Sequence, residues 1–430
     1  MQDSVAVLPS VSAHDEAARG FDVARLLAPA QALSLYFAGA TIVPPGIETV
    51  PLDDAFGRVL ARDAVAREDH PGHARSTMDG YAVAAGTGLH LQLVGEVRMG
   101  APAPRPIGAG ETLRIPTGGA LPGGAHAVVP QEDVTLEGDT IVLREPPAAG
   151  ASVTQRGEDI RAGEVVLPAG RRVGASELGV LATLGCNVVD VYRQPRVGII
   201  STGDELVDPS ATPGAGQVRD SNRYALAGAL RALGAAPMHL PRAVDTLEAL
   251  RSAVRDGLAA CDALVLTGGS SVGVRDLVPR VVAELGAPGA LVHGIRVKPG
   301  KPTLLGAVGA KPVIGLPGNP TSSLMIFEAI VRPIVHALTG ECAAPPAPLE
   351  AIASEAFVGR EGWTWYVPAR VIRRGAVFEA QPLPLRSAHT SLLARAFGYA
   401  VIGETPARVA AGDRIAVYRF ASGGAPICNA

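Results

Sequence analysis

The spacing of apolar and polar residues changes several times along the chain. In residues 22–43 apolar positions recur at roughly helical intervals, and residues 52–60 predict a second helix. In residues 62–148 the pattern becomes short runs typical of strands, separated by turn residues. Apolar strands then alternate with helices between about residues 195 and 338, and strand-type runs return after residue 346. The pattern therefore predicts an α/β plus β protein.

The length of the chain sets how many domains it can form. A chain of 430 residues is too long for one hydrophobic core and should divide into about three or four domains. We expect a small β domain inserted into the first domain, then a doubly wound α/β domain, and a small β-barrel at the end. The expected boundaries are 1–21 for a flexible tail, 22–61 with 149–190 for a discontinuous N-terminal domain of helical and extended segments, 62–148 for the inserted β domain, 191–340 for the α/β domain and 346–424 for the barrel.

Composition narrows the range of partners. The formal net charge of −3 gives no electrostatic reason to expect nucleic acid or an anionic membrane as a partner. The four cysteines are widely scattered with no C-x-x-C pair, which indicates neither a zinc site nor a disulfide framework. The chain has no run of eighteen apolar residues and no cationic segment followed by an apolar one at its start. We therefore expect a cytoplasmic protein.

The segment 261–327 carries the strongest chemical signal. Two apolar runs, Ala263–Thr267 and Val313–Leu316, each end in a turn, at Gly268-Gly269 and at Pro317-Gly318-Asn319-Pro320. Exposed backbone N–H groups at such turns, with the positive end of the following helix dipole, form a cradle for phosphate or another oxyanion. Lys298 and Lys301 flank a Pro-Gly turn between the two runs. Each feature alone is also consistent with a tight βα turn or a solvated hairpin, but together they favour an anion site.

Acidic residues are predicted at the same edge of the sheet. Glu205, Asp220, Asp245 and Asp276 each follow a predicted strand of one parallel sheet, where doubly wound folds place their ligands. Each could equally cap a helix, most clearly Asp220. Acids close to an anion site would repel a polyanion unless a divalent cation lay between them. Magnesium, which bridges carboxylates to phosphate oxygens, resolves this conflict.

Three further segments combine charged and turn-forming residues. They are Ser76-Thr77-Met78-Asp79-Gly80-Tyr81-Ala82, Arg114-Ile115-Pro116-Thr117-Gly118-Gly119 and Arg156-Gly157-Glu158-Asp159-Ile160. By residue chemistry alone, Asp79 caps a turn, the second segment is an ordinary strand end and the third is a surface ion pair.

These segments, together with TGGSSVGVRD, VKPGKP and GLPGNPTSS in this order, closely resemble the MoeA family of molybdenum-inserting enzymes, relatives of the gephyrin E domain. The resemblance covers roughly residues 25–420. It implies a MogA-like α/β domain that binds molybdopterin, and Mg²⁺-dependent insertion of molybdate into adenylylated molybdopterin with release of AMP. It also implies an elongated homodimer in which Asp79 faces the nucleotide-binding domain of the other subunit, with molybdopterin adenylyltransferase and target molybdoenzymes as further partners.

The resemblance also implies a set of site residues. The expected catalytic residues are Asp79, Thr117, Asp159, Glu205, Asp245 and Asp276, of which Glu205, Asp245 and Asp276 would hold the metal. The expected substrate-binding residues are Ser201, Thr202, Gly203, Asp220, Gly268, Gly269, Ser270, Ser271, Lys298, Lys301, Pro317, Gly318, Asn319, Pro320, Ser322, Arg370 and Ser387.

The chain departs from the family pattern at several positions. Val153-Thr154-Gln155 stands where relatives carry a further arginine, and Pro368 stands where they carry another, with Arg370 nearby. Phe397 replaces an acid or amide, and Ser387 and His389 lie in a loop that in relatives helps to hold molybdate. Two rival functions therefore stay open: a molybdopterin adenylyltransferase, and a non-catalytic pterin carrier or scaffold.

Overall fold

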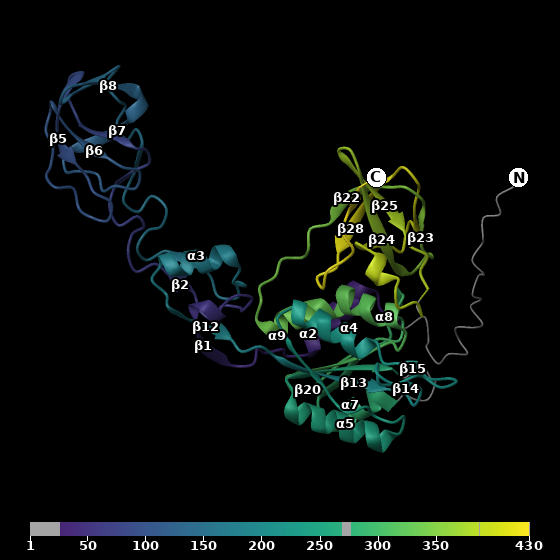
Figure 1. The fold of residues 1–430 in the computed structure, drawn as a ribbon. Helices are drawn as coiled ribbons and strands as arrows, with labels where there is room; N and C mark the ends of the chain where they lie inside the picture. Colours follow the sequence, from purple (N-terminus) through teal and green to yellow (C-terminus); the bar gives the residue numbers. More distant parts are fainter. Residues whose placement is uncertain (1–25, 269–276, 387, 430) are drawn as a thin grey trace, which may run out of the picture. The chain divides into compact units, whose positions relative to one another are not determined.

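The computed structural model describes residues 26–268, 277–386 and 388–429 of the chain (Figure 1). Its described residues form two compact units. Unit 1 comprises the chain up to Glu48, the short piece Gly57–Val59 and the chain from Val191 onward. Unit 2 comprises Thr49–Phe56 and Leu60–Asp190. Each unit is described by itself below.

A mixed six-stranded sheet forms the centre of unit 1. Its strand order is β16-β13-β17-β21-β20-β18; the first four strands are parallel, and β20 and β18 are antiparallel to their neighbours. The bounds are β13 (Arg196–Thr202), β16 (Ala236–His239), β17 (Ala263–Gly268), β18 (Pro288–His293), β20 (Leu304–Val308) and β21 (Lys311–Leu316). A separate two-stranded sheet joins β14 (Leu206–Val207) and β15 (Val218–Arg219).

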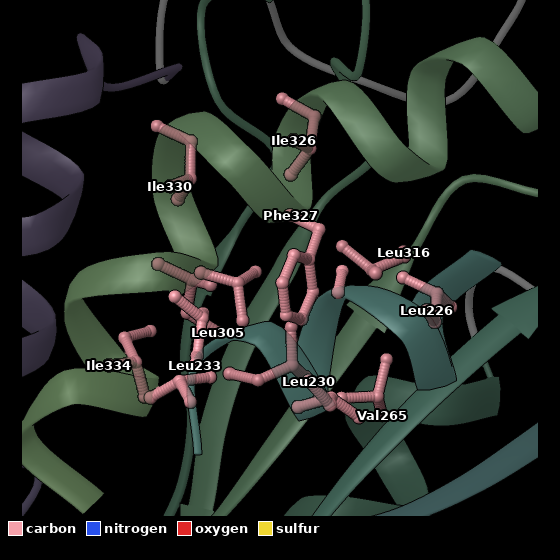
Figure 2. Packing of buried hydrophobic residues seen from close by; sticks show 14 of the residues in the cluster. Leu226, Leu230, Leu233, Val265, Leu305, Leu316, Ile326, Phe327, Ile330 and Ile334 are labelled. Atoms are coloured by element: carbon pink, nitrogen blue, oxygen red, sulfur yellow. The ribbon is translucent and has the colours of Figure 1, made fainter. Parts of the chain in front are cut away.

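Helices cover both faces of this sheet because its buried strands are apolar on both sides. Val265 and Ile314 belong to one core cluster, whereas their neighbours Leu264 and Val313 belong to another. The first cluster includes α2 (Pro29–Gly39), α4 (Asn222–Ala232), α8 (Pro320–Ile326), η4 (Phe327–Val331) and α9 (Arg332–Thr339), and the second includes α5 (Leu247–Ala260) and α7 (Leu277–Leu285). Figure 2 shows the ring of Phe327 pointing into the first cluster.

One continuous helical segment, Pro320–Thr339, is long and apolar enough to cross a membrane by length and composition, but 67% of it is buried inside the protein. Its middle turn is a π-helix that carries Glu328, which is 3% exposed. The carboxylate of Glu328 accepts hydrogen bonds from the Ala421 amide (3.0 Å) and from the amide (3.2 Å) and hydroxyl (2.5 Å) of Ser422. The helix thus behaves as a core helix with one buried acid.

Five strands of the C-terminal region close into a barrel, as the alternating apolar runs predict. The pairings β24-β25, β25-β22, β22-β28, β28-β26 and β26-β24 complete the circle. The bounds are β22 (Leu349–Ala353), β24 (Thr364–Arg374), β25 (Val377–Pro382), β26 (Gly398–Ile402) and β28 (Arg414–Arg419). Two short strands, β19 (Val297–Lys298) and β29 (Cys428–Asn429), pair with β24, and β23 (Phe357–Val358) pairs with β27 (Arg408–Val409); η5 spans Leu393–Arg395.

Unit 2 contains a six-stranded sheet of order β7-β4-β6-β5-β9-β8. Its strands are β4 (Gly80–Ala84), β5 (His90–Glu96), β6 (Glu111–Ile115), β7 (Ala125–Pro130), β8 (Val134–Glu137) and β9 (Thr140–Leu143). Smaller elements are η2 (Leu52–Asp54), β2 (Ala64–Val65), β3 (Arg75–Ser76), η3 (Gln131–Asp133), β10 (Val153–Thr154), β11 (Val165–Leu167) and α3 (Ala175–Thr183). Two paired strands, β1 (Ile47–Pro51) and β12 (Val188–Tyr192), include residues of both units.

The first two predicted helices differ in outcome. Helix α2 forms within residues 22–43 and begins at Pro29, whose fixed φ suits a first helical turn. The second predicted helix, residues 52–60, is wrong: only the short η2 forms there. Gly57 has φ +75°, which ends helical geometry, and the amide of Leu60 donates to the carbonyl of Arg171 instead of to its own turn.

Candidate functional site

The ends of three parallel strands lie side by side in unit 1. In the sheet register Thr202 is opposite Gly268, and Thr267 is opposite Leu316. Gly268 has φ +128°, and a Cβ there would lie 2.0 Å from the Thr202 carbonyl oxygen, so this position admits only glycine. A Cβ on Gly318 would lie 3.3 Å from the Gly268 Cα. The end of β17 and the turn after β21 therefore pack backbone against backbone.

Asn222, the first residue of α4, joins these turns. Its Nδ2 donates to Thr267 Oγ1 at 2.9 Å and to the Gly318 carbonyl at 2.7 Å. The sequence analysis missed Asn222, although it directly follows Asp-Ser at the start of an Ala- and Leu-rich helix. An amide can donate twice from one atom, which a carboxylate at this position could not do.

Hydroxyl groups surround the same strand ends. Ser201 is fully buried and its Oγ has no hydrogen-bond partner among the described residues. Thr202 and Ser322 are 3% and 4% exposed. Asn319 precedes α8 as its N-cap without a side-chain hydrogen bond, and Pro320 is the first helical residue. Gly269, Ser270, Ser271, Asp276 and Ser387, all predicted site residues, lie outside the described residues.

Two of the predicted acids come together at this edge. Burial raises the pKa of the Asp245 carboxyl, and the negative charges of Asp204 and Glu205 raise it further. Oδ1 of Asp245 is buried with no partner among the described residues. The side chain of Glu205 folds against Gly203, where a Cβ would lie 2.5 Å from Glu205 Oε2. Asp204 is the neighbour that the sequence analysis did not select.

Asp220 corrects the expectation that four acids follow strands of one sheet. It is 4% exposed and follows β15, which pairs only with β14 outside the six-stranded sheet. Its Oδ1 accepts from the Arg223 amide at 3.3 Å, and its Oδ2 lies 3.6 Å from Arg223 Nε. Asp220 therefore serves the first turn of α4, the capping alternative that its sequence context left open.

The acids fit a divalent cation in their chemistry. A buried carboxylate oxygen without a partner, next to two further carboxylates, is an oxygen-rich and negatively charged environment that suits Mg²⁺. Within the described part of the chain, no group of three or more His, Cys, Asp or Glu side chains is arranged to hold a metal ion. Two of the three predicted ligands, Glu205 and Asp245, are thus neighbours, and the third, Asp276, is outside the described residues.

The turn that carries both predicted lysines is held by buried groups. Pro299 and Gly300 are buried, and a Cβ on Gly300 (φ +108°) would lie 2.0 Å from a side-chain carbon of Ile326 in α8. Lys298 is exposed, with its Nζ 5.7 Å from the centre of the Trp365 ring in the barrel strand β24. Lys301 is half-buried. The turn is thus fixed against α8, in contrast to a solvated hairpin.

A loop of the barrel is attached to the first turn of α8. Thr321, 1% exposed, donates from its Oγ1 to the His389 carbonyl at 2.5 Å. An open hollow in the surface is lined by Ala388, His389, Thr390 and Ser391. Arg370, on β24, is half-buried.

The departures from the family pattern have clear places in the fold. Phe397 is 6% exposed in the barrel core, and Pro368 is opposite Tyr399 in the pairing of β24 with β26. Thr154 is opposite Arg75 in the pairing of β10 with β3.

In unit 2 two of the three motif segments meet, and the strand before the third segment pairs with the first. Val153 on β10 is opposite Ser76 on β3, and the Ser76 carbonyl accepts from the Gly118 amide at 2.8 Å. Gly80 packs so closely on β7 that a Cβ would lie 2.1 Å from the Val129 carbonyl oxygen. Segments far apart in the chain therefore meet around β3.

Two predicted site residues of unit 2 contact each other directly. Asp79 Oδ1 accepts from the Thr117 amide at 2.7 Å and from Thr117 Oγ1 at 2.9 Å. These bonds, and more weakly the charge of Arg114, hold the pKa of the Asp79 carboxyl below its usual range. Asp79 thus reaches across to another segment, in contrast to a cap of its own turn. Asp159 is exposed on the loop after β10.

The fold and these sites define a class: a doubly wound domain with glycine turns for an anionic ligand, joined to a barrel and to a second, β-rich unit. A family model described as the MoeA N-terminal region (domain I and II) matches residues 27–185, and one described as a probable molybdopterin binding domain matches residues 198–337.

Curated relatives carry one name. The molybdopterin molybdenumtransferase of a Nostoc strain is 35% identical over 68% of this chain and 70% of its own length. The molybdopterin molybdenumtransferase of Haemophilus influenzae is 34% identical over 69% of this chain and 74% of its own length. Two solved structures of the molybdopterin biosynthesis MoeA protein of Pyrococcus horikoshii resemble this chain. The first is 32% identical, has a TM-score of 0.73 and aligns over 92% of this chain and 99% of its own. The second is 27% identical, has a TM-score of 0.78 and aligns over 92% of this chain and 100% of its own. The chain belongs to the MoeA family of molybdopterin molybdenumtransferases, enzymes of molybdenum cofactor biosynthesis.

Proposed function

We propose that this protein inserts molybdate into adenylylated molybdopterin in a Mg²⁺-dependent reaction that releases AMP. The observation that carries the proposal is that Asn222 joins the end of β17 to the turn after β21. Thr202 at the end of β13 pairs with Gly268 and with Ala243, and the acids Glu205 and Asp245 follow these positions closely in the sequence. This arrangement offers amide donors and hydroxyl groups to phosphate next to carboxylates that a divalent cation would satisfy. Membership of the MoeA family supports the same substrates.

In this proposal the strand ends bind and orient the substrate. Backbone amides at Gly268, Gly269 and Gly318, with the hydroxyls of Ser270 and Ser322, donate to the phosphate oxygens. Lys298 and Lys301 neutralise part of their charge. Fixed donors are effective here because the close backbone packing holds Gly268 and Gly318 at the strand ends. No covalent nucleophile of the protein is needed: an oxygen of water or molybdate attacks the phosphorus of the pterin phosphate, and the phosphoanhydride bond breaks with AMP as the leaving group.

Glu205, Asp245 and Asp276 would hold Mg²⁺. When bound, the cation would supply Lewis-acid stabilisation of the charge that develops on the leaving AMP. Asp245 supports this assignment because its buried, unpartnered Oδ1 and raised pKa are the properties of a carboxylate that lacks a counter-charge. In unit 2, Asp79 and Asp159 would help to order the water on the cation or a loop of the partner subunit. Thr117 holds Asp79 in its ionised form.

The proposal also includes the location, the oligomeric state and the partners of the protein. We propose that the chain works in the cytoplasm as a homodimer and receives its substrate from a molybdopterin adenylyltransferase. The product then passes to target molybdoenzymes.

The deciding experiment measures AMP release from adenylylated molybdopterin with and without molybdate and Mg²⁺. We expect release only when both are present, and at least a hundredfold slower release from Asp276→Asn, in line with the loss of a metal ligand. Asp256→Asn serves as the control with the same change of charge, because Asp256 lies on α5 in an exposed ion pair with Arg255. Pterin binding without AMP release would favour the carrier function, and pyrophosphate formed from molybdopterin and ATP would favour the adenylyltransferase.

A further inference from the structure

The loop after β10 carries Arg156 and Arg161 on either side of Glu158 and Asp159, and Arg156 is paired with an acid from another segment. Arg156 Nε donates to Oδ2 of Asp69 at 2.7 Å, across 87 positions of the chain. Glu158 Oε2 accepts from the Gln155 amide at 2.6 Å. Among the described residues, no hydrogen bond or ion pair engages the exposed carboxylate of Asp159. Asp69 therefore engages one of the two arginines that flank Asp159 in the sequence, and the carboxylate of Asp159 stays open.

Asp69 also fixes the backbone on both sides of Asp159. Its Oδ1 accepts from the Ala162 amide at 2.9 Å. Gly157 (φ +68°) packs on it so closely that a Cβ would lie 3.2 Å from Asp69 Cγ. The adjoining carbonyl of His70 accepts from the Ile160 amide at 3.0 Å. Bonds to Ala162 and Arg156 hold the pKa of Asp69 below its usual range, so it is ionised at neutral pH and can accept both.

We propose that Asp69 is a positioning residue: its carboxylate holds residues 156–162 so that Asp159 presents an open carboxylate to the substrate or to its hydrated cation. The proposal rests on the function proposed above, in which Asp159 takes part in the reaction. Asp69 itself touches no reacting atom. It acts through the geometry of the loop, to which its bonds with Arg156 and Ala162 contribute.

The test compares Asp69→Asn with Glu111→Gln, which replaces another carboxylate of unit 2 by its amide. Glu111 accepts from Arg105 Nη2 at 2.7 Å and from the Gly108 amide at 3.2 Å. Like Asp69, it thus accepts from one arginine and one backbone amide, so Glu111→Gln is the control. We expect Asp69→Asn to lower kcat by up to about 10²-fold, the effect of a misplacement of about 1 Å. KM for adenylylated molybdopterin should change less than about twofold, because uniform binding is unaffected.

Two readouts separate positioning from a general loss of structure. Hydrogen exchange at the amides of residues 157–162 should become faster in Asp69→Asn and stay unchanged in Glu111→Gln. Asp69→Glu keeps the charge and should recover most of kcat. Arg156→Gln removes the same ion pair from the other side and serves if Asp69→Asn does not fold.

The outcomes are distinct. Equal kcat and equal loop exchange in Asp69→Asn and Glu111→Gln would overturn the proposal, as would a full kcat in Asp159→Asn, since the loop would then present nothing that the reaction uses. A wild-type chain that binds pterin but releases no AMP would overturn the proposed function. The exchange data would still decide whether Asp69 holds the loop.

Discussion

Asp245 in unit 1 and Asp79 in unit 2 are both expected to serve the reaction, yet their surroundings are opposite. Burial and two neighbouring acids raise the pKa of Asp245, and one of its oxygens has no partner among the described residues. Two hydrogen bonds from Thr117 lower the pKa of Asp79. The carboxylate of Asp79 already accepts two hydrogen bonds, whereas the carboxylate of Asp245 has a buried oxygen that a cation would stabilise. The first is typical of a positioned base or water-binding group, and the second of a metal ligand.

The two regions are also built differently. At the strand ends of unit 1, glycines allow backbone to touch backbone, as at Gly268 and Gly318. In unit 2 the motif loops are tied by side-chain carboxylates that accept from amides of distant segments, as Asp79 and Asp69 do. The close packing of backbone at Gly268 and Gly318 leaves almost no space for an added atom. The loops held by Asp79 and Asp69 depend instead on the negative charge of these side chains. The predictions below test this difference, beginning with the largest expected effect.

The strongest effect should come from Gly268→Ala. The new Cβ would lie 2.0 Å from the Thr202 carbonyl at φ +128°, so strain and overpacking should lower the free energy of unfolding by about 3 kcal/mol. Gly309→Ala is the matched control, because its φ is +59° and nothing lies within 4 Å of the added atom. It should lower the free energy of unfolding by about 1 kcal/mol. Denaturant unfolding measures both, and equal losses would contradict the close-packed description.

A smaller effect is expected when Asp245 is neutralised. Without Mg²⁺, Asp245→Asn should be more stable than wild type at neutral pH, because it removes a charge that folding places beside two acids. With Mg²⁺ at about 100 times its Kd, the wild type should gain roughly 2.7 kcal/mol and the variant much less. Thermal unfolding with and without Mg²⁺ measures the difference. A variant that gains as much as the wild type would remove Asp245 from the metal site.

The smallest effect is in the pH dependence, where the two acids have opposite signs. The folded pKa of Asp79 is below its unfolded value of about 3.9, so its stabilisation is present above that value and is lost as pH falls through the folded pKa. The folded pKa of Asp245 is raised, so its contribution improves as pH falls through that pKa toward the unfolded value. Asp79→Asn should flatten the acid side of the stability profile, and Asp245→Asn the side nearer neutral pH. Urea unfolding from pH 3 to 7 checks both; a shared sign would contradict the comparison.

Local pattern was sufficient to predict much of the fold. The strand ends at Thr267 and Leu316 and the strands of the barrel were predictable, because apolar runs bounded by Gly and Pro encode buried strands. The second helix failed because Gly57 and a distant partner, Arg171, determined that segment.

The site was predictable in its residue types and less so in its contacts. Resemblance selected Asp79 and Thr117, but only the fold shows that they bond to each other. The sequence did not predict the roles of Asn222 and Asp69, because their hydrogen-bond partners are 45 or more positions away and nothing in the local sequence marks such a pairing. Asp220 was misplaced because β15 belongs to another sheet, which periodicity cannot reveal.

The buried carboxylate of Glu328 has a consequence for how the chain folds. Ser422, one of its donors, lies 94 positions further along the chain, after the barrel strand β28. Without that segment, the middle of the helix would carry a buried acid with neither of the residues that donate to it. The packing of the α/β domain therefore depends on a segment that follows β28, and the α/β domain and the barrel are expected to fold cooperatively.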